Sequence, residues 1–134
     1  MTAMIGFFRT ILKLPFPWLV WIALLMCANM VVPVFFFGTL EGKLVFLAAV
    51  AGAAGQTWIF NSKDFVRLLG AGHLPWLPLV IWLWFRLGQI PSDGIFRYWI
   101  ISVIVLDTIS LAIHFTDVVR YIIGDRRPQL ILEK

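Results

Sequence analysis

Residues 95–123 read IFRYWIISVIVLDTISLAIHFTDVVRYII, and this stretch decides the fold. It is longer than the roughly 20 apolar residues that a helix needs to cross a hydrocarbon core about 30 Å thick. The ionisable side chains in its interior must face other helices or a wet cavity, because a charge exposed to lipid is costly. The stretch therefore predicts a transmembrane helix with one polar face turned toward partner helices.

Three other apolar segments are candidate spans, at residues 16–37, 44–60 and 74–90. The connections between successive segments are short, which favours antiparallel neighbours in an up-down bundle. We therefore predict an all-α fold. Residues 1–134 form a single integral membrane domain, a four-transmembrane-helix antiparallel bundle that ends in a cytoplasmic tail over residues 124–134.

The composition of the whole chain agrees with a membrane protein. Of 134 residues, 61% are hydrophobic and 13% are charged, and the mean hydropathy is +0.93. A soluble domain has about 45–50% apolar and about 25% charged residues, and a chain this short cannot bury so much apolar surface in water. The single cysteine, Cys27, also excludes the paired thiols of a membrane disulfide oxidoreductase.

The first fourteen residues form a separate element. Thr2, Gly6, Arg9 and Lys13 recur at spacings of four, three and four, so they share one face of a helix whose other residues are mainly apolar. Pro15 separates this helix from the first span. We predict a short N-terminal amphipathic helix over residues 1–14 that lies in the membrane interface; the alternative is a leader continuous with the first span.

Lysine and arginine residues predict the orientation. Eight lie on the side that the N-terminus shares with the second loop and the C-terminus: Arg9, Lys13, Lys63, Arg67, Arg120, Arg126, Arg127 and Lys134. Three lie on the other side: Lys43, Arg86 and Arg97. Because short cytoplasmic loops carry the excess of cationic residues, both termini are predicted to be cytoplasmic, with the protein in a bacterial inner membrane.

The net charge of +4 is then mainly a topology signal. No basic patch with interleaved aromatic residues indicates a nucleic-acid partner. We expect contacts with anionic lipid headgroups from four cationic residues near the two termini, Arg9, Lys13, Arg126 and Arg127.

Two kinds of residue near the span ends are expected to be anchors. Five tryptophans fall where aromatic belts meet the membrane interface: Trp18, Trp21, Trp58, Trp76 and Trp99. Arg86 lies inside the third span, and we expect its side chain to extend outward or to pair with Asp93.

Asp107 predicts a polar layer in the middle of the membrane. It lies about twelve residues from the outer end of its span, at a rise of about 1.5 Å per residue. The same depth in the other spans reaches Asn29, Gln56, Thr57 and Pro78. Pro78 would leave the carbonyl of Leu74 without a helical donor. Two interpretations are open: hydrogen bonds that fix the helix register, or a site for a small ligand or a proton relay.

A second polar level is expected about seven residues nearer the cytoplasm. It contains both histidines and several neighbours: Asn61, Asp64, His73, His114 and Asp117. His114 and Asp117 share a helix face, and imidazole with carboxylate suits zinc or iron. A site for another ligand or headgroup, or hydrogen bonds that close the bundle, are the alternatives, so the pattern assigns no metal or cofactor.

These features favour a non-enzymatic membrane protein. Such a protein would assemble with itself or with a larger membrane complex, or would bind a lipid or small apolar molecule through its polar interior. The alternative is a metal-dependent enzyme or a small transporter that uses His73, His114 and Asp117.

Overall fold

The computed structural model describes residues 2–63 and 67–125, and the side chains of residues 5–62 and 70–125. Every regular element in this part of the chain is helical, which confirms the all-α class. In chain order the elements are α1 (Thr2–Ile11), α2 (Phe16–Met26), the π-helix η1 (Cys27–Val31), α3 (Val32–Phe35), α4 (Leu40–Lys63), the 3-10 helix η2 (Arg67–His73), α5 (Trp76–Leu87) and α6 (Ile95–Ile122).

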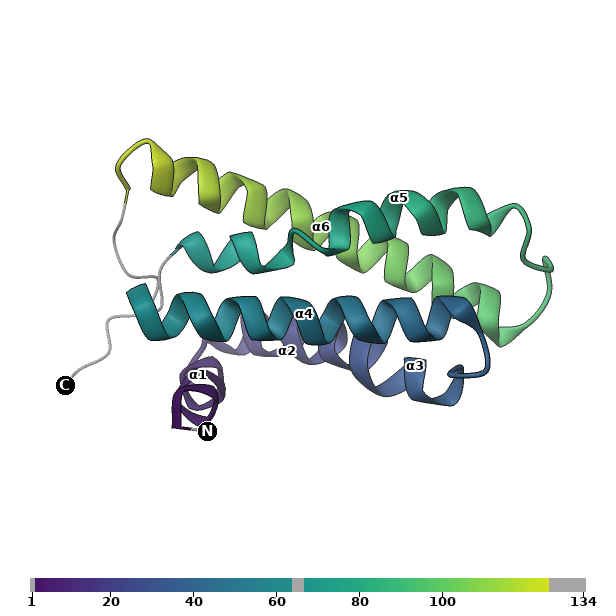
Figure 1. The fold of residues 1–134 in the computed structure, drawn as a ribbon, viewed down its shortest axis with the longest axis horizontal. Coiled ribbons are helices and arrows are strands. Elements are labelled where there is room, and N and C mark those ends of the chain that lie inside the picture. Colours follow the sequence, from purple (N-terminus) through teal and green to yellow (C-terminus); the bar gives the residue numbers. More distant parts are fainter. Residues whose placement is uncertain (1, 64–66, 126–134) are drawn as a thin grey trace.

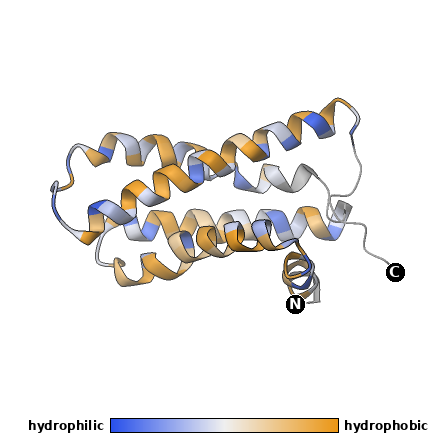
Figure 2. Ribbon diagram, turned by 180° about the vertical axis from the view of Figure 1, so that it is seen from behind, coloured by the Kyte–Doolittle hydropathy of each residue, from blue (hydrophilic) through white to orange (hydrophobic). Residues whose placement is uncertain are grey.

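Three stretches are long and apolar enough to cross a membrane. They are Phe16–Phe35, Leu40–Ser62 and Ile95–Ile122, which correspond to the predicted first, second and fourth spans. Figure 1 shows them side by side along the long axis of the molecule, with the α3–α4 and α5–α6 connections at the same end. Hydrophobic residues predominate along these helices (Figure 2), as expected for surfaces that face lipid.

The third predicted span, residues 74–90, is not one long helix. α5 has 12 residues, about 18 Å at the usual helical rise, which is less than the thickness of a hydrocarbon core. Pro75 is its N-cap and Pro78 lies in its first turn, where no backbone donor is required. The carbonyl of Leu74 therefore lies outside the helix and accepts from the N–H of Leu77 at 3.2 Å, so the predicted donorless carbonyl is absent.

The first span contains a π-bulge in its middle. The N–H of Val32 donates to the carbonyl of Cys27, five residues earlier. Pro33 is next and has no N–H, so in this register the carbonyl of Ala28 has no donor in its own helix. The indole Nε1 of Trp99 donates to that carbonyl at 2.9 Å. The bulge thus joins the first span to α6.

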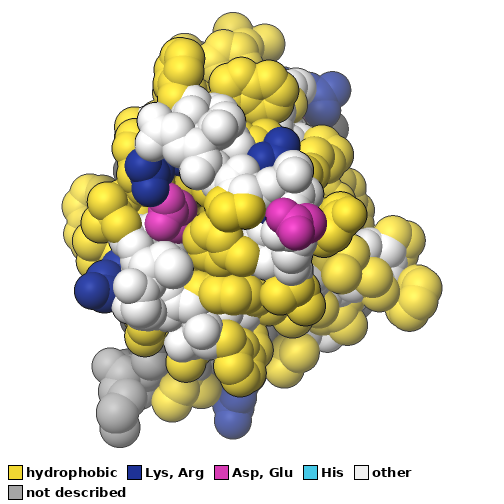
Figure 3. All heavy atoms as spheres, turned by 90° about the vertical axis from the view of Figure 1, so that its right-hand side faces the viewer, with side chains coloured by type: hydrophobic (Ala, Val, Ile, Leu, Met, Phe, Trp, Pro, Cys, Tyr) yellow, Lys and Arg dark blue, Asp and Glu magenta, His cyan; other side chains and the backbone are white. Residues whose placement is uncertain are grey.

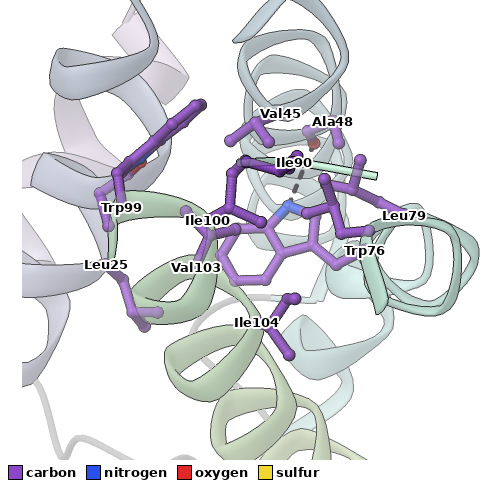
Figure 4. Close-up of a cluster of buried hydrophobic side chains, with 12 residues drawn as sticks. Leu25, Val45, Ala48, Trp76, Leu79, Ile90, Trp99, Ile100, Val103 and Ile104 are labelled. Atoms are coloured by element: carbon purple, nitrogen blue, oxygen red, sulfur yellow. Dashed lines mark hydrogen bonds between the residues drawn. The ribbon is translucent and has the colours of Figure 1, made fainter. Parts of the chain in front are cut away.

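Two of the tryptophans expected to be interface anchors are core residues. Trp76 and Trp99 are each only 6% exposed. In Figure 4 the indole of Trp76 lies among the side chains of the core, and its Nε1 donates to the carbonyl of Ala48 on α4 at 3.2 Å. Trp18 and Trp58 are exposed, as expected for anchors. A buried indole needs an acceptor, and backbone carbonyls of neighbouring helices supply it.

Charged and polar side chains mix with hydrophobic ones at the end that carries the α3–α4 and α5–α6 connections (Figure 3). Arg86 pairs there with Glu41 at the start of α4 and not with Asp93, through Nε at 2.9 Å and Nη2 at 2.6 Å from Glu41 Oε1. Arg97 donates to the carbonyl of Leu87, the last residue of α5, at 2.9 Å and to that of Ile90 in the following loop at 3.0 Å. Both arginines therefore stabilise the end of α5.

α1 lies across the opposite end of the long helices (Figure 1). The ring of Phe7 is 5.7 Å from that of Phe60 near the end of α4. Phe7 and Ile11 are buried, whereas Arg9 and Lys13 are exposed. The N-terminal helix therefore packs its apolar face against the bundle and leaves its cationic residues outside.

Candidate functional site

Three polar side chains in the middle of the bundle form what we call the deep polar cluster: Asn29, Asp107 and Ser110. Their exposed fractions are 1%, 0% and 0%. The amide Nδ2 of Asn29 donates to Asp107 Oδ1 at 2.8 Å and to the carbonyl of Leu25 at 3.1 Å. The π-bulge carries Asn29, and the spacing of three residues places Asp107 and Ser110 on one face of α6.

Three oxygen atoms of this cluster have no hydrogen-bond partner among the described residues. They are Asn29 Oδ1, Asp107 Oδ2 and Ser110 Oγ. Each unsatisfied buried polar atom costs about 1–3 kcal/mol, and such atoms are rare enough in native structures to require an explanation. The deep polar cluster can therefore accept at least one further donor.

The second polar group, which we call the histidine cluster, consists of Gln56, His73 and His114. The two imidazole rings stack with centroids 3.9 Å apart and an interplanar angle of 17°. Gln56 Nε2 donates to His73 Nδ1 at 2.9 Å. The ring of Trp76 lies edge-on to His73 at 4.4 Å. The cluster thus joins α4, η2 and α6.

Glycine residues of η2 allow this close approach. A Cβ on Gly72 would lie 2.5 Å from Gln56 Cγ and 3.1 Å from the carbonyl oxygen of Gly52. A Cβ on Gly70 would lie 2.9 Å from the Cβ of His114. Only glycine fits at these two contacts, and the sequence Gly70-Ala71-Gly72-His73 is the signal that could have predicted them.

The geometry of the histidines does not fit a shared zinc or iron ion. Lone pairs of imidazole lie in the ring plane, and two nearly parallel stacked rings direct them along separate planes and not toward one point. Among the described residues, no group of three or more histidine, cysteine, aspartate or glutamate side chains is placed to hold a metal. The chemistry that the cluster offers is hydrogen bonding and aromatic stacking.

A cavity of about 650 Å³ opens beside the histidine cluster, between α1, α2, α4, η2 and α6. Most of its wall is apolar, and α1 and α2 contribute Phe8, Trp18, Trp21, Ile22, Leu25 and Met26. Its polar lining comes from Asn29, Gln56, His73, His114, Thr116, Asp117 and Arg120. The cavity therefore combines an apolar wall with a few polar groups, as ligand sites commonly do.

The structure divides the predicted mid-membrane layer. It brings Asn29 and Asp107 together. Gln56, however, bonds to His73 in the other cluster. The hydroxyl of Thr57 donates to the carbonyl of Ala53 in its own helix at 2.8 Å and joins neither cluster. The residue count fails on α4 because this helix begins at Leu40 and not at residue 44, so Gln56 reaches His73 and not Asp107.

The predicted cytoplasmic cluster is smaller than the sequence suggested. His73 and His114 meet, and Asp117 lies on the cavity wall beside them. Asn61 is exposed. Asp64, Arg126 and Arg127 lie outside the described residues. No local pattern in the sequence identifies Trp99 as a donor to the π-bulge, since that contact depends on tertiary packing.

The cavity and the two polar clusters are the features from which a function can be inferred. No protein-family model, curated protein sequence or solved structure matches this chain. Its function must therefore be inferred from the chemistry of these side chains.

Proposed function

We propose that this chain is a non-enzymatic integral membrane protein that binds a single-chain amphipathic molecule in the cavity between its helices. The cavity itself carries the proposal. Its volume of about 650 Å³ is within the range of about 300–1,000 Å³ that is common for small-molecule sites. The mainly apolar wall suits an acyl chain, and Asp117 and Arg120 near the C-terminal end of α6 suit a compact headgroup.

The same proposal includes four membrane crossings, with η2 and α5 together as a broken third span. Local 3-10 geometry is tolerated at membrane depth where neighbouring helices cover it. Gly70, Gly72 and His73 of the 3-10 helix η2 are buried, which supports a place for η2 within the membrane. The excess of lysine and arginine on one side supports cytoplasmic termini and a bacterial inner membrane.

The polar lining supports a zwitterionic headgroup. Asp117 and Arg120 line the cavity near the C-terminal end of α6 and present a carboxylate and a guanidinium. A carboxylate attracts an ammonium group, and a guanidinium binds phosphate. The apolar side chains of α2 then accommodate the acyl chain. We take lysophosphatidylethanolamine, which has one acyl chain and a zwitterionic headgroup, as the probe.

Filling the cavity tests the binding function. Ala53 lines the cavity, whereas Ala51 is exposed on the outside of α4 and does not line it. We expect Ala53→Phe to weaken binding of the probe at least tenfold and Ala51→Phe to leave it unchanged, as measured by native mass spectrometry of the full chain. Equal binding by all three proteins, or an equal loss in both variants, would contradict the proposal.

A headgroup comparison tests the ligand class. Arg120 is exposed, and exposed ion pairs contribute about 0.2–1 kcal/mol, which is at most about fivefold in affinity. We expect Arg120→Gln to weaken the binding of lysophosphatidylethanolamine by up to that factor and to leave the binding of uncharged monoacylglycerol unchanged. An equal loss of affinity for both probes would argue against recognition of the headgroup.

Cysteine labelling tests the four crossings. Cys27 is the only cysteine, so Cys27→Ala provides a background without thiols. In that background we expect Thr39→Cys and Ser92→Cys to react with an impermeant maleimide from outside the cell, and Leu12→Cys to be protected. Labelling of Ser92→Cys from the cytoplasmic side alone would contradict four crossings.

The interrupted helices favour one second candidate, a small transporter. Transporters often place their sites where discontinuous helices meet near the middle of the membrane. The cavity is lined by Asn29 of the π-bulge and by His73 beside the break in the third segment. Movement of the bound lipid between the leaflets of reconstituted vesicles would support transport. Binding without movement would support the binding function alone.

A further inference from the structure

The deep polar cluster has fewer hydrogen-bond donors than its oxygen atoms need. Both amide hydrogens of Asn29 have acceptors, at Asp107 Oδ1 and the carbonyl of Leu25. Asp107 Oδ2, Asn29 Oδ1 and Ser110 Oγ are without partners among the described residues. The Ser110 hydroxyl supplies the single remaining hydrogen, and one hydrogen can serve only one of the two other oxygens, Asp107 Oδ2 and Asn29 Oδ1.

We propose that Asp107 binds a proton on Oδ2, and that the deep polar cluster is a proton-binding site in the middle of the bundle. The protonated carboxyl adds a hydrogen-bond donor to the cluster. We expect it to reach Ser110 Oγ, one helical turn away on the same face of α6, by rotation of the two side chains, because the structure shows no hydrogen bond between them. The proton also removes a negative charge from the membrane interior, where an ionised carboxylate is costly.

A metal cation fits these residues less well than a proton. Calcium and magnesium take six or more oxygen ligands, and the three free oxygens would fill about half of such a shell. The amide Nδ2 of Asn29 also directs a hydrogen at Asp107 from 2.8 Å, which a neighbouring cation would repel. The cluster therefore favours a single small positive charge that can itself donate a hydrogen bond.

Among the described residues, Asp107 has no cationic partner that could take the place of this proton. Its hydrogen-bond partner is the neutral amide of Asn29. Arg86 pairs with Glu41, Arg97 binds carbonyls at the end of α5 and in the loop after it, and the two histidines stack on each other. The described ionisable side chains on the elements around Asp107 are Cys27 on η1, Glu41 and Lys43 on α4, His73 on η2, Arg86 on α5, and Arg97, Tyr98, His114, Asp117, Arg120 and Tyr121 on α6.

Asn29 connects the proton-binding site at Asp107 to the cavity. It is the one member of the deep polar cluster that also lines the cavity wall. A proton that enters through the cavity therefore reaches Asp107 beside Asn29. This route rests on the proposed ligand cavity, whereas the proton site itself does not, so the two are tested separately.

Infrared difference spectroscopy tests the site directly, because a protonated carboxyl has its own carbonyl stretching band. The full chain in lipid vesicles is measured at neutral pH in H₂O and in D₂O. The chain has 7 aspartate and glutamate residues, and those in contact with water are ionised at this pH. We expect a protonated-acid band that moves to lower frequency in D₂O and is lost in Asp107→Asn.

Two further variants keep the test decisive if Asp107→Asn folds poorly. Ser110→Ala removes the acceptor of the acid proton, so the band should shift to higher frequency. Thr108→Val, on the exposed side of α6, should leave the band unchanged. Addition of sodium at constant pH should also leave it unchanged. The absence of an acid band that depends on Asp107, or its disappearance when sodium is added, would overturn the proposal whatever the outcome of lipid binding.

Discussion

The deep polar cluster and the histidine cluster accommodate buried polar side chains in different ways. Both hold polar side chains between apolar helices. The deep polar cluster joins the π-bulge to α6 and leaves three buried oxygens without partners among the described residues. The histidine cluster joins three elements through ring stacking and an amide hydrogen bond, and it lines the cavity.

This difference indicates what each cluster can do. The deep polar cluster has too few donors and touches the cavity only through Asn29, so it can hold a proton. A cluster on a cavity wall can contact a ligand, provided that the backbone around it keeps its shape. The close glycine contacts of η2 supply that rigidity, so the histidine cluster should be the more sensitive of the two to steric change.

The largest effect is expected from Gly72→Ala at the histidine cluster. The new Cβ would lie 3.0 Å from the backbone nitrogen of Gln56 and 3.1 Å from the carbonyl oxygen of Gly52, and neither can move cheaply. Overpacking of this kind costs about 3 kcal/mol. Thermal unfolding in detergent should show the loss. Gly88→Ala is the control, since a Cβ there meets nothing within 4 Å; equal stability of the two variants would refute the tight contact.

A smaller effect is expected from Asn29→Leu at the deep polar cluster. This change removes the only described hydrogen-bond partner of Asp107 and should destabilise the fold by about 1–2 kcal/mol. The double variant Asn29→Leu with Asp107→Leu should recover most of that loss, because replacing a whole buried polar pair by apolar residues is often neutral. Denaturation of the four proteins as a double-mutant cycle measures the coupling. Strict additivity would show that the pair does not interact.

Trp99→Phe should separate packing from hydrogen bonding at the π-bulge. The ring still stacks on Phe36, whose centroid lies 4.9 Å from that of Trp99, but the donor to the Ala28 carbonyl is lost. Hydrogen bonds between helices in membranes contribute about 0.6 kcal/mol on average, so we expect a loss of about that size. Trp58→Phe, at an exposed residue, serves as the reference in the same unfolding assay. A loss as large as that of Gly72→Ala would mean that the bulge itself had collapsed.

The smallest effect is expected from Thr57→Val. Its hydroxyl bonds to the carbonyl of Ala53 within α4 and belongs to neither cluster. Substitutions away from such networks usually change stability by less than about 0.5 kcal/mol. Unfolding curves that coincide with those of the unmodified protein are the expected result. A clear loss of stability would support the single mid-membrane polar layer that the sequence predicts.

Much of the helical architecture can be predicted from the sequence, because hydrophobic length and proline positions are local signals. Residues 95–123 and 16–37 correspond closely to helices found in the structure. The break before α5 also has a local cause in Pro75 and Pro78. A count of apolar residues misses it, because residues 74–90 are apolar enough to be counted as one span.

The candidate site was less predictable, since side-chain partners depend on how helices rotate and bend. The π-bulge turns Asn29 toward Asp107, whereas Gln56 faces His73 across a contact that only glycine allows. Arg86 meets Glu41, 45 residues away in the chain, and no spacing rule predicts that pair. Local patterns identify the polar residues but not which of them meet.

Photocrosslinking in lipid vesicles tests directly whether the cavity holds an acyl chain. The probe is lysophosphatidylethanolamine with a photoreactive group in its chain, and peptide mapping locates the adducts. We expect adducts on Leu25 and Met26 of the cavity wall, with competition by unlabelled probe and loss in Ala53→Phe. Adducts spread evenly over exposed residues such as Leu47 and Trp58, without competition, would contradict binding in the cavity.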